Sequence, residues 1–223
     1  MKKLFTLILS ITLIVLCFSC KKDKKETTTT PPSGTVSIDG QQSPMGVVGT
    51  TVSSSSGVIA GVSSSSASVI ALDNGVSTYT GSAIVTNPAI INLLSNIPEI
   101  TINGDTVSTN SAKFRSTVEG IESCSGPGQG ILVKYSSAVG DTYPINSTGE
   151  VRTVVSKSTT DDYSYGYMLI KVMQVEANPI YKSLGVTKIT YIANHKFGLV
   201  GIKVNFDDGT TATFPVYTSA QNP

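Results

Sequence analysis

The sequence predicts an all-β fold, an antiparallel β-sandwich that carries one short helix. Short runs rich in Val, Ile, Thr and Tyr alternate with Gly, Asn, Asp and Pro, which is the pattern of strands separated by turns. Asp208-Gly209 separates two alternating runs, 199–206 and 210–217, and Asp-Gly in that setting is a strong β-hairpin signal. A closed β-barrel with a ligand cavity is the alternative architecture.

Further turn signals order the remaining strands. Asn74-Gly75 and Asn103-Gly104 each separate two strand-like runs, as expected of tight hairpins. The glycine-rich segment 126–130 predicts a wider connection. The long run 163–176 and the run 186–193 are expected to complete the core strands.

One segment carries helical signals. Asn87 suits an N-cap, and Pro88 suits the first helical position. The apolar body that follows ends before Pro98, which forbids continuation. We expect this helix to plug one end of the sandwich or barrel.

The serine-rich segment 52–71 contains a short internal repeat, because residues 52–60 recur in similar form as 62–71. A solenoid needs at least about three copies to form a continuous core. Two copies predict adjacent strands, with the serine tracts at turns or exposed edges.

Residues 1–19 have the order of a secretory signal peptide. Lys2 and Lys3 precede an apolar stretch of 13 residues from Leu4 to Leu16, and Ser19 supplies a small residue before Cys20. The apolar stretch is shorter than the roughly 20 residues that cross a bilayer as a helix. We therefore expect cleavage before Cys20.

The segment 16–20 (Leu-Cys-Phe-Ser-Cys) resembles the lipobox of bacterial lipoproteins. The resemblance implies that Cys20 is lipidated with two or three acyl chains and becomes the mature N-terminus. A single acyl chain gives only marginal membrane binding, so such an anchor would be permanent. Lys21 in place of Asp implies, by resemblance to Gram-negative lipoproteins, an outer-membrane location on the periplasmic or cell-surface face. An ordinary secretory signal that is cut elsewhere is the alternative.

The mature chain divides into a tether and a domain. Residues 20–34 form the lipidated cysteine and a linker with four consecutive threonines, Pro31-Pro32 and no large apolar residue after Cys20, a composition that cannot form a core. Its fourteen residues after Cys20 span roughly 45–50 Å when extended. Residues 35–223 form the β-rich domain. Two smaller β units split near Asn110 are the alternative.

Charge limits the partners of the chain. Six of the 16 basic and two of the 15 acidic residues precede residue 35, so the domain has ten bases and thirteen acids, a formal charge of −3. No basic patch of the kind that nucleic acid requires is visible. We expect no nucleic-acid partner, and a membrane partner only through the N-terminal lipid.

The sequence contains no complete catalytic or metal-binding set. His195 is the only histidine and lies in a predicted hairpin turn, and no Gly-x-Ser-x-Gly motif is present. The acidic pairs Asp161-Asp162 and Asp207-Asp208 lie on loops that suit calcium but lack the EF-hand spacing. We expect a non-enzymatic protein without catalytic residues, metal or cofactor. Cys124 is expected to be a small buried apolar side chain.

The tyrosines of the segment 163–167 are the candidate binding residues. Tyr163, Tyr165 and Tyr167 have strand spacing and would share one face. The opposite face would carry core residues, namely Met168, Ile170 and Val172. This pattern predicts an outward aromatic stripe that binds a glycan or an envelope protein, whereas cross-strand aromatic packing would give the same residues a purely structural role.

Two further functions are compatible with the sequence. The chain could be a structural or envelope-assembly lipoprotein that binds no ligand. If the fold were a closed barrel, its interior would suit a carrier of a small apolar ligand.

Overall fold

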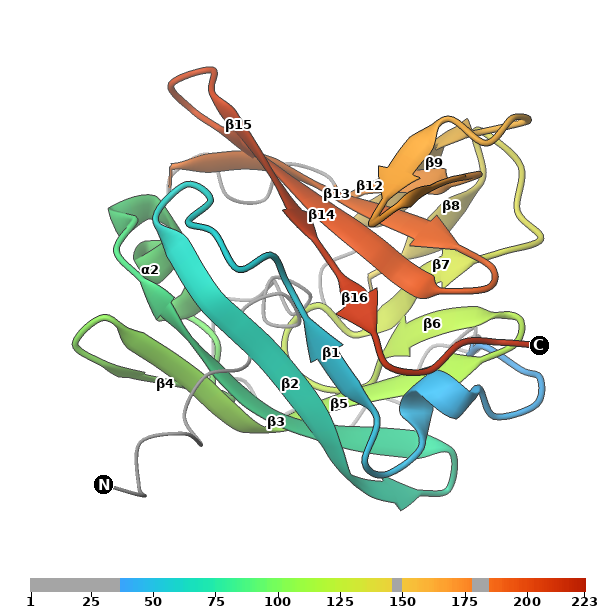
Figure 1. Ribbon diagram of the computed structural model, residues 1–223, viewed down its shortest axis with the longest axis horizontal. Helices are drawn as coiled ribbons and strands as arrows, with labels where there is room; N and C mark the ends of the chain where they lie inside the picture. Colours follow the sequence, from blue (N-terminus) through green and yellow to red (C-terminus); the bar gives the residue numbers. More distant parts are fainter. Residues whose placement is uncertain (1–36, 146–149, 178–184) are drawn as a thin grey trace, which may run out of the picture.

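The computed structural model describes residues 37–145, 150–177 and 185–223. The signal segment 1–19, Cys20 and the linker lie outside the described residues. Two antiparallel sheets pack face to face, a curled eight-stranded sheet and a six-stranded sheet, and a separate two-stranded hairpin completes the fold (Figure 1). The prediction of an all-β sandwich is confirmed.

The eight-stranded sheet forms the curled layer of the sandwich (Figure 1). Its strands, in spatial order, are β16 (Tyr217–Thr218), β1 (Thr51–Ser53), β2 (Val62–Asp73), β3 (Val76–Val85), β5 (Thr106–Thr117), β6 (Gly120–Ser123) and β7 (Gly130–Lys134), with β4 (Ile100–Asn103) paired to β5. The strands β4 and β6 pair with opposite ends of the long strand β5, which widens the sheet.

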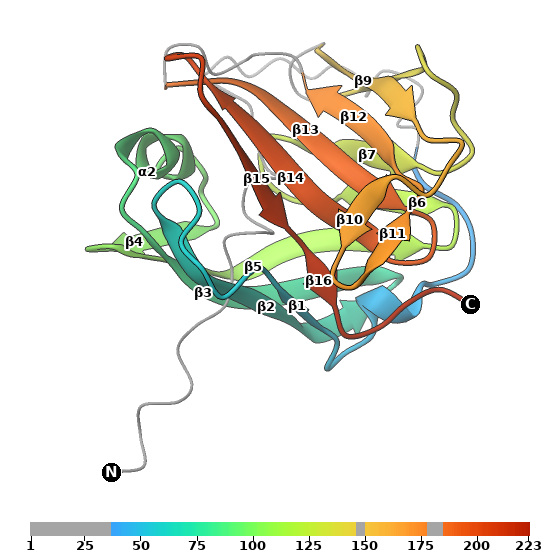
Figure 2. The same cartoon turned by 45° about the horizontal axis from the view of Figure 1, so that its top comes forward.

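The six-stranded sheet forms the second layer. Its strands, in spatial order, are β15 (Thr211–Pro215), β14 (Gly198–Phe206), β13 (Val186–Asn194), β12 (Met173–Ala177), β9 (Val151–Lys157) and β8 (Thr142–Pro144). After Pro215 the chain passes through buried Val216 into β16 of the other sheet (Figure 2). This crossing joins the two layers along one edge.

The core lies between the two sheets and draws on both. Val107 of β5, Leu132 of β7 and Ile202 of β14 are fully buried in one cluster. Arg152 of β9 is also buried there, where its guanidinium donates to the carbonyl oxygens of Ile131 and Gly128. Burying a cation without a hydrogen-bond acceptor is costly, and these two carbonyl groups supply acceptors.

The predicted hairpins at Asn74-Gly75, Asn103-Gly104 and Asp208-Gly209 are confirmed. Asn74 and Gly75 have φ values of 49° and 77°, as a type I′ turn between β2 and β3 requires. In the second hairpin Asn103 pairs with Thr106, so Gly104 and Asp105 form the loop. In the third, the Asp208 carboxylate accepts hydrogen bonds from the amide and hydroxyl of Thr210.

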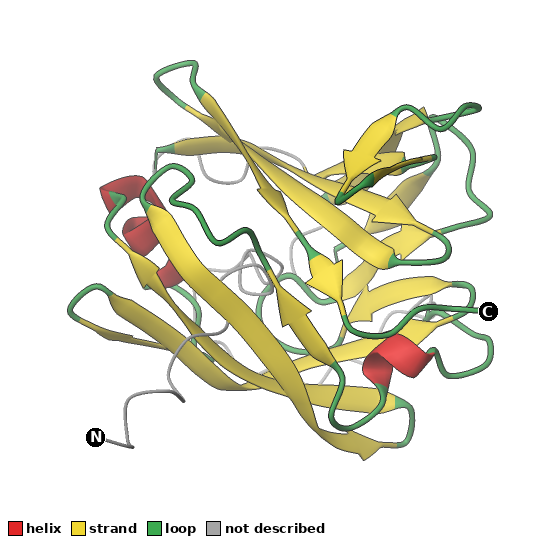
Figure 3. Cartoon of the chain, in the orientation of Figure 1, coloured by secondary structure: helices red, strands yellow, loops and turns green. Residues whose placement is uncertain are grey.

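The predicted helix is confirmed as α2 (Pro88–Leu94). The side chain of Asn87 accepts hydrogen bonds from the amides of Ala89 and Ile90, as an N-cap does. The helix buries Leu93 and Leu94 in the main core and covers one end of the space between the sheets (Figure 3). A single 3₁₀ turn, Pro44–Gly46, lies near the opposite end.

The serine repeat is only partly as predicted. Its two copies do provide neighbouring strands, since Val52 of β1 pairs with Ala67 of β2. The second serine tract, however, lies inside β2, where Ser65 and Ser66 are buried. The small size of serine allows it to face the interior of a sheet without a large cavity.

The prediction of one long strand over 163–176 is wrong. The chain forms β10 (Tyr163–Tyr165), reverses at Gly166-Tyr167, returns as β11 (Met168–Ile170), and only then enters β12. Gly166 has a φ of 59°, and glycine at the first loop position with positive φ is what a type II′ hairpin turn requires. The backbone preference of this glycine outweighs the β propensity of its neighbours.

No helix within the described parts of the chain is long and apolar enough to cross a membrane.

Candidate binding site

The hairpin β10–β11 lies on the outer face of the six-stranded sheet, in front of β13 and β14 (Figure 2). Its register pairs Tyr163 with Ile170 and Tyr165 with Met168. Because directly paired residues share a face, the hairpin directs Tyr163, Tyr165 and Ile170 toward the sheet. There they cover Ile192 and Val200 in a second, smaller apolar cluster.

Aromatic contacts hold the turn end of the hairpin, at Tyr165, against the sheet. Tyr165 is 8 % exposed, and its ring centroid lies 5.0 Å from that of Phe197 and 5.2 Å from that of Tyr217. Burial raises the pKa of Tyr165, so the phenol is neutral at ordinary pH. Lys196 lies beside the same group, with its ammonium nitrogen 5.9 Å from the centroid of Phe197.

Tyr163 fits the sheet because Gly201 lies beneath it. A Cβ atom at Gly201 would lie 2.5 Å from the hydroxyl oxygen of Tyr163, closer than two such atoms can approach. The missing side chain therefore makes room for the tyrosine. Burial raises the pKa of Tyr163 as well.

The predicted outward stripe of Tyr163, Tyr165 and Tyr167 is therefore wrong. Tyr165 is buried and Tyr163 is half-buried, whereas Tyr167 in the turn is fully exposed. The three side chains do not share a face because the strand reverses between Tyr165 and Tyr167. Cross-strand aromatic packing describes Tyr163 and Tyr165 correctly.

The tip of the hairpin exposes three consecutive apolar side chains. Tyr167 is fully exposed, Met168 is 50 % exposed and Leu169 is 59 % exposed. Met168, expected in the core, lies at the open end of the inner face, and Leu169 points away from the sheet. We call these three residues the hairpin tip. Contiguous exposed apolar side chains are typical of interaction sites.

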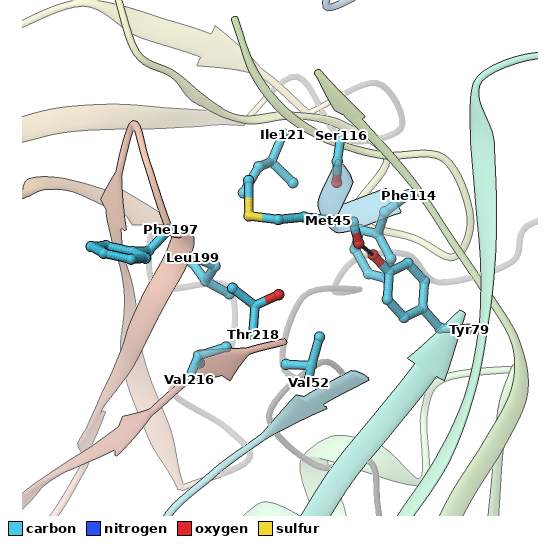
Figure 4. Close-up of a pocket in the computed structure, with 10 residues that line it drawn as sticks. All are labelled: Met45, Val52, Tyr79, Phe114, Ser116, Ile121, Phe197, Leu199, Val216 and Thr218. Carbon is cyan, nitrogen blue, oxygen red and sulfur yellow. Dashed lines mark hydrogen bonds between the residues drawn. The ribbon is translucent and has the colours of Figure 1, made fainter. Parts of the chain in front are cut away.

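The space between the sheets contains a cavity of about 40 Å³. Its walls are nearly all apolar, and the hydroxyl of Tyr79 donates to the carbonyl oxygen of Met45 beside it (Figure 4). An engineered apolar cavity that binds benzene has a volume of about 150 Å³. This cavity is therefore too small for a carried apolar ligand.

The other residues singled out from the sequence lie apart from the hairpin tip. His195 lies in the turn between β13 and β14, as predicted, and is exposed. Cys124 is half-buried rather than buried, and burial raises the pKa of its thiol. Within 37–145, 150–177 and 185–223, no three His, Cys, Asp or Glu side chains are placed to hold a metal ion.

No protein-family model, curated protein or solved structure matches the chain. The sequence nevertheless carried one signal for the hairpin. Tyr165-Gly166-Tyr167 places glycine where a two-residue loop needs a positive φ, and Gly-x between alternating residues is a known hairpin signal.

Proposed function

We propose that this chain is a lipid-anchored cell-envelope protein that acts by non-catalytic binding, and that its hairpin tip contacts an apolar surface of another envelope protein. The observation that carries the proposal is the exposure of Tyr167, Met168 and Leu169 on a hairpin whose inner face is already fastened. A tip held in this way loses little conformational freedom on binding, which favours association.

The composition of the tip favours a protein partner over a glycan. Stacking on sugar rings uses aromatic faces, and two of the three tyrosines are engaged by Phe197, Tyr217 and Gly201. The chain also contains no Trp. What remains exposed is one aromatic and two flexible aliphatic side chains, and methionine in particular adapts to varied protein surfaces.

The anchor part of the proposal is supported by the resemblance of segment 16–20 to a lipobox. Lipidation at Cys20 would place the domain at the outer membrane, on the periplasmic or cell-surface side. A tether raises the effective concentration of the domain near membrane partners. A small apolar contact, too weak for association in free solution, is then sufficient.

Site-specific photo-crosslinking tests the tip. A photoreactive phenylalanine analogue replaces Tyr167 in the full lipidated chain, and a matched control replaces Val58, which is 73 % exposed elsewhere on the surface. We expect a discrete envelope-protein adduct from position 167 that is absent from position 58. The adduct should disappear when Leu169→Asp is added.

Three different results would contradict the proposed partner. A lipid adduct would assign the tip to the membrane surface, and an adduct between two copies would assign it to self-association. No adduct at all would favour a structural or envelope-assembly role. The anchor is tested separately: Cys20→Ala should abolish incorporation of radiolabelled palmitate and release the chain from the membrane fraction.

A further inference from the structure

A recess of about 320 Å³ opens where β7 and β9 end and the turn between β13 and β14 begins. None of the three residues of the hairpin tip lines it. Its walls are formed by Tyr135, Lys157, Ser158, Lys171, Val172, Met173, Ala193, Asn194, His195 and Lys196. Its volume is at the lower end of the range of small-molecule sites.

The charge of the recess is opposite to that of the domain. Three of the ten basic residues beyond residue 34 line it, namely Lys157, Lys171 and Lys196, whereas none of the thirteen acidic residues there is among its lining residues. The domain has a formal charge of −3. The presence of three lysines among the lining residues of one recess is therefore a local feature.

The three ammonium groups are not neutralised by carboxylates in the parts of the chain that the structure describes. The ion pairs there join Arg115 with Glu122 and Lys188 with Glu176. The ammonium of Lys157 donates to the carbonyl oxygens of Tyr135 and Ser137, at 3.0 and 2.9 Å. The acid bonded to the rim is Asp162, which accepts from the Ser158 hydroxyl at 2.8 Å.

The backbone of the recess is fixed by two asparagines. The Asn194 side chain accepts hydrogen bonds from the amides of Lys196 and Phe197 and donates to the carbonyl oxygen of Lys171, at 2.7 Å. Asn222 donates to the carbonyl oxygens of His195 and Lys196. Two of the three lysines are therefore carried on backbone that is already ordered, which is what a binding site requires.

Tyr135 adds a polar group without a partner. It is 9 % exposed, and its hydroxyl makes no hydrogen bond within the described residues. Burial raises the pKa of this phenol, so it remains a donor. Its ring meets that of His195 edge to face, with centroids 5.3 Å apart. Buried polar groups without partners are rare in native proteins, and this one belongs to a residue that lines the recess.

From this geometry we infer that the recess binds the anionic group of a small ligand, a carboxylate, phosphate or sulfate. Lys171 and Lys196 supply the charge, and Lys157 supplies its remaining N–H. Asn194 lines the same recess and keeps one side-chain N–H beside them, because its other N–H donates to the carbonyl oxygen of Lys171. The inference concerns a second site and does not depend on the hairpin tip.

Calorimetric titration tests the site on the full mature chain with Cys20→Ala. The probes are inorganic phosphate, inorganic sulfate, glucuronate and, as the neutral control, glucose. We expect the anions to bind and glucose not to bind. Stronger binding of glucuronate than of phosphate would identify an acidic sugar as the source of the anion, and the reverse order would identify phosphate. Added salt should weaken binding, because screening reduces the attraction of exposed charges.

Two variants locate the site. Lys171→Gln combined with Lys196→Gln should lower affinity about 10- to 100-fold, the effect of losing hydrogen bonds to a charged group. The matched control, Lys113→Gln on the exposed side of β5, should leave affinity unchanged. Tyr135→Phe should lower affinity about tenfold while the free protein keeps or gains stability, because an unpaired buried hydroxyl is removed.

Three results would overturn the inference. They are the absence of binding by all three anions, equal binding of glucose, and unchanged affinity in the double lysine variant. The uncharged tip variant Leu169→Ser should leave anion binding intact, so failure of one site is distinguishable from failure of the other.

Discussion

The two faces of the six-stranded sheet are buried in different ways. The inner face carries Ile202 into the main core, where a whole second sheet covers it. The outer face carries Ile192 and Val200, which the short hairpin β10–β11 covers together with Phe197 and Tyr217. Regions with few buried apolar contacts open more easily than the core. We infer that the inner face holds the fold together and that the outer face holds one hairpin in place.

A β-bulge allows the one strand to serve both faces. Ile192 pairs with Gly201, and Ala193 pairs with Leu199, so Val200 is the extra residue. Bulges place two residues opposite one and re-aim side chains. Here the bulge turns Val200 outward while Leu199 and Ile202 both face the main core.

One truncation on each face of the sheet tests this difference, and we expect it to give the largest effect on stability. Ile202→Ala should lower the free energy of unfolding by about 4 kcal/mol and Ile192→Ala by about 2 kcal/mol, both within the range for such cavities. The second cost is lower because the hairpin can move into the space that Ile192 leaves. Urea denaturation measures both costs, provided that the dependence of the unfolding free energy on urea concentration is unchanged in the variants. Equal costs would mean that the outer face is as firmly packed as the inner one.

Alkaline pH provides a second test. Burial raises the pKa of Tyr79 in the main core to about 12, and it also raises the pKa of Tyr165 under the hairpin. The unfolded chain loses these protons first, near pH 10, so the stabilisation present below that pH is lost as pH rises through the folded value. The free energy of unfolding should therefore fall between pH about 10 and about 12. Its decrease with pH should be shallower in the Tyr79→Phe variant than in the Tyr165→Phe variant. The reverse order would contradict the comparison.

Removing the buried ring of the hairpin should have a local effect. We expect Tyr165→Ala to cost about 2 kcal/mol, at or below the range for aromatic truncation in cores, and to release the hairpin amides to hydrogen exchange. Tyr167→Ala at the tip serves as the control and should remain within about 0.5 kcal/mol of the parent chain. Exchange that spreads to β12 would show that the hairpin supports the sheet.

The smallest expected effect concerns the contact between Tyr163 and Gly201. Gly201→Ala should cost about 1 kcal/mol, the lower end for overpacking, because the clash falls on the far end of a side chain. Adding Tyr163→Phe should recover part of that loss in a double-mutant cycle. If the stability costs of the two substitutions were additive, Tyr163 and Gly201 would not be in contact.

Local signals in the sequence predicted the sandwich well. Asn74-Gly75, Asp208-Gly209 and the Asn87-Pro88 cap act within a few residues, and each formed the expected element. Strand periodicity does not predict the hairpin β10–β11, because the alternation of Tyr163, Tyr165 and Tyr167 continues across Gly166. Periodicity reports which side chains alternate and is silent on where a chain reverses.

The basic recess could not be predicted from the sequence. Lys157, Lys171 and Lys196 are separated by 14 and 25 residues, and only the pairing of β9, β12 and β13 brings them to one edge. The unpaired hydroxyl of Tyr135 is likewise a property of packing. A sequence read along its length contains no signal for either.

Asn222 joins two parts of the fold that are far apart in the sequence. Its side-chain oxygen Oδ1 accepts from the Ser43 hydroxyl at 2.7 Å, while its side-chain amide and its backbone amide donate to the carbonyl oxygens of His195 and Lys196. Ser43 is also held to β5, because its amide donates to the carbonyl oxygen of Ser116 and its neighbour Gln42 bridges to Thr117. The N-terminal part of the domain is therefore linked by side chains to the rim of the recess, although no strand in the described part of the chain joins the two.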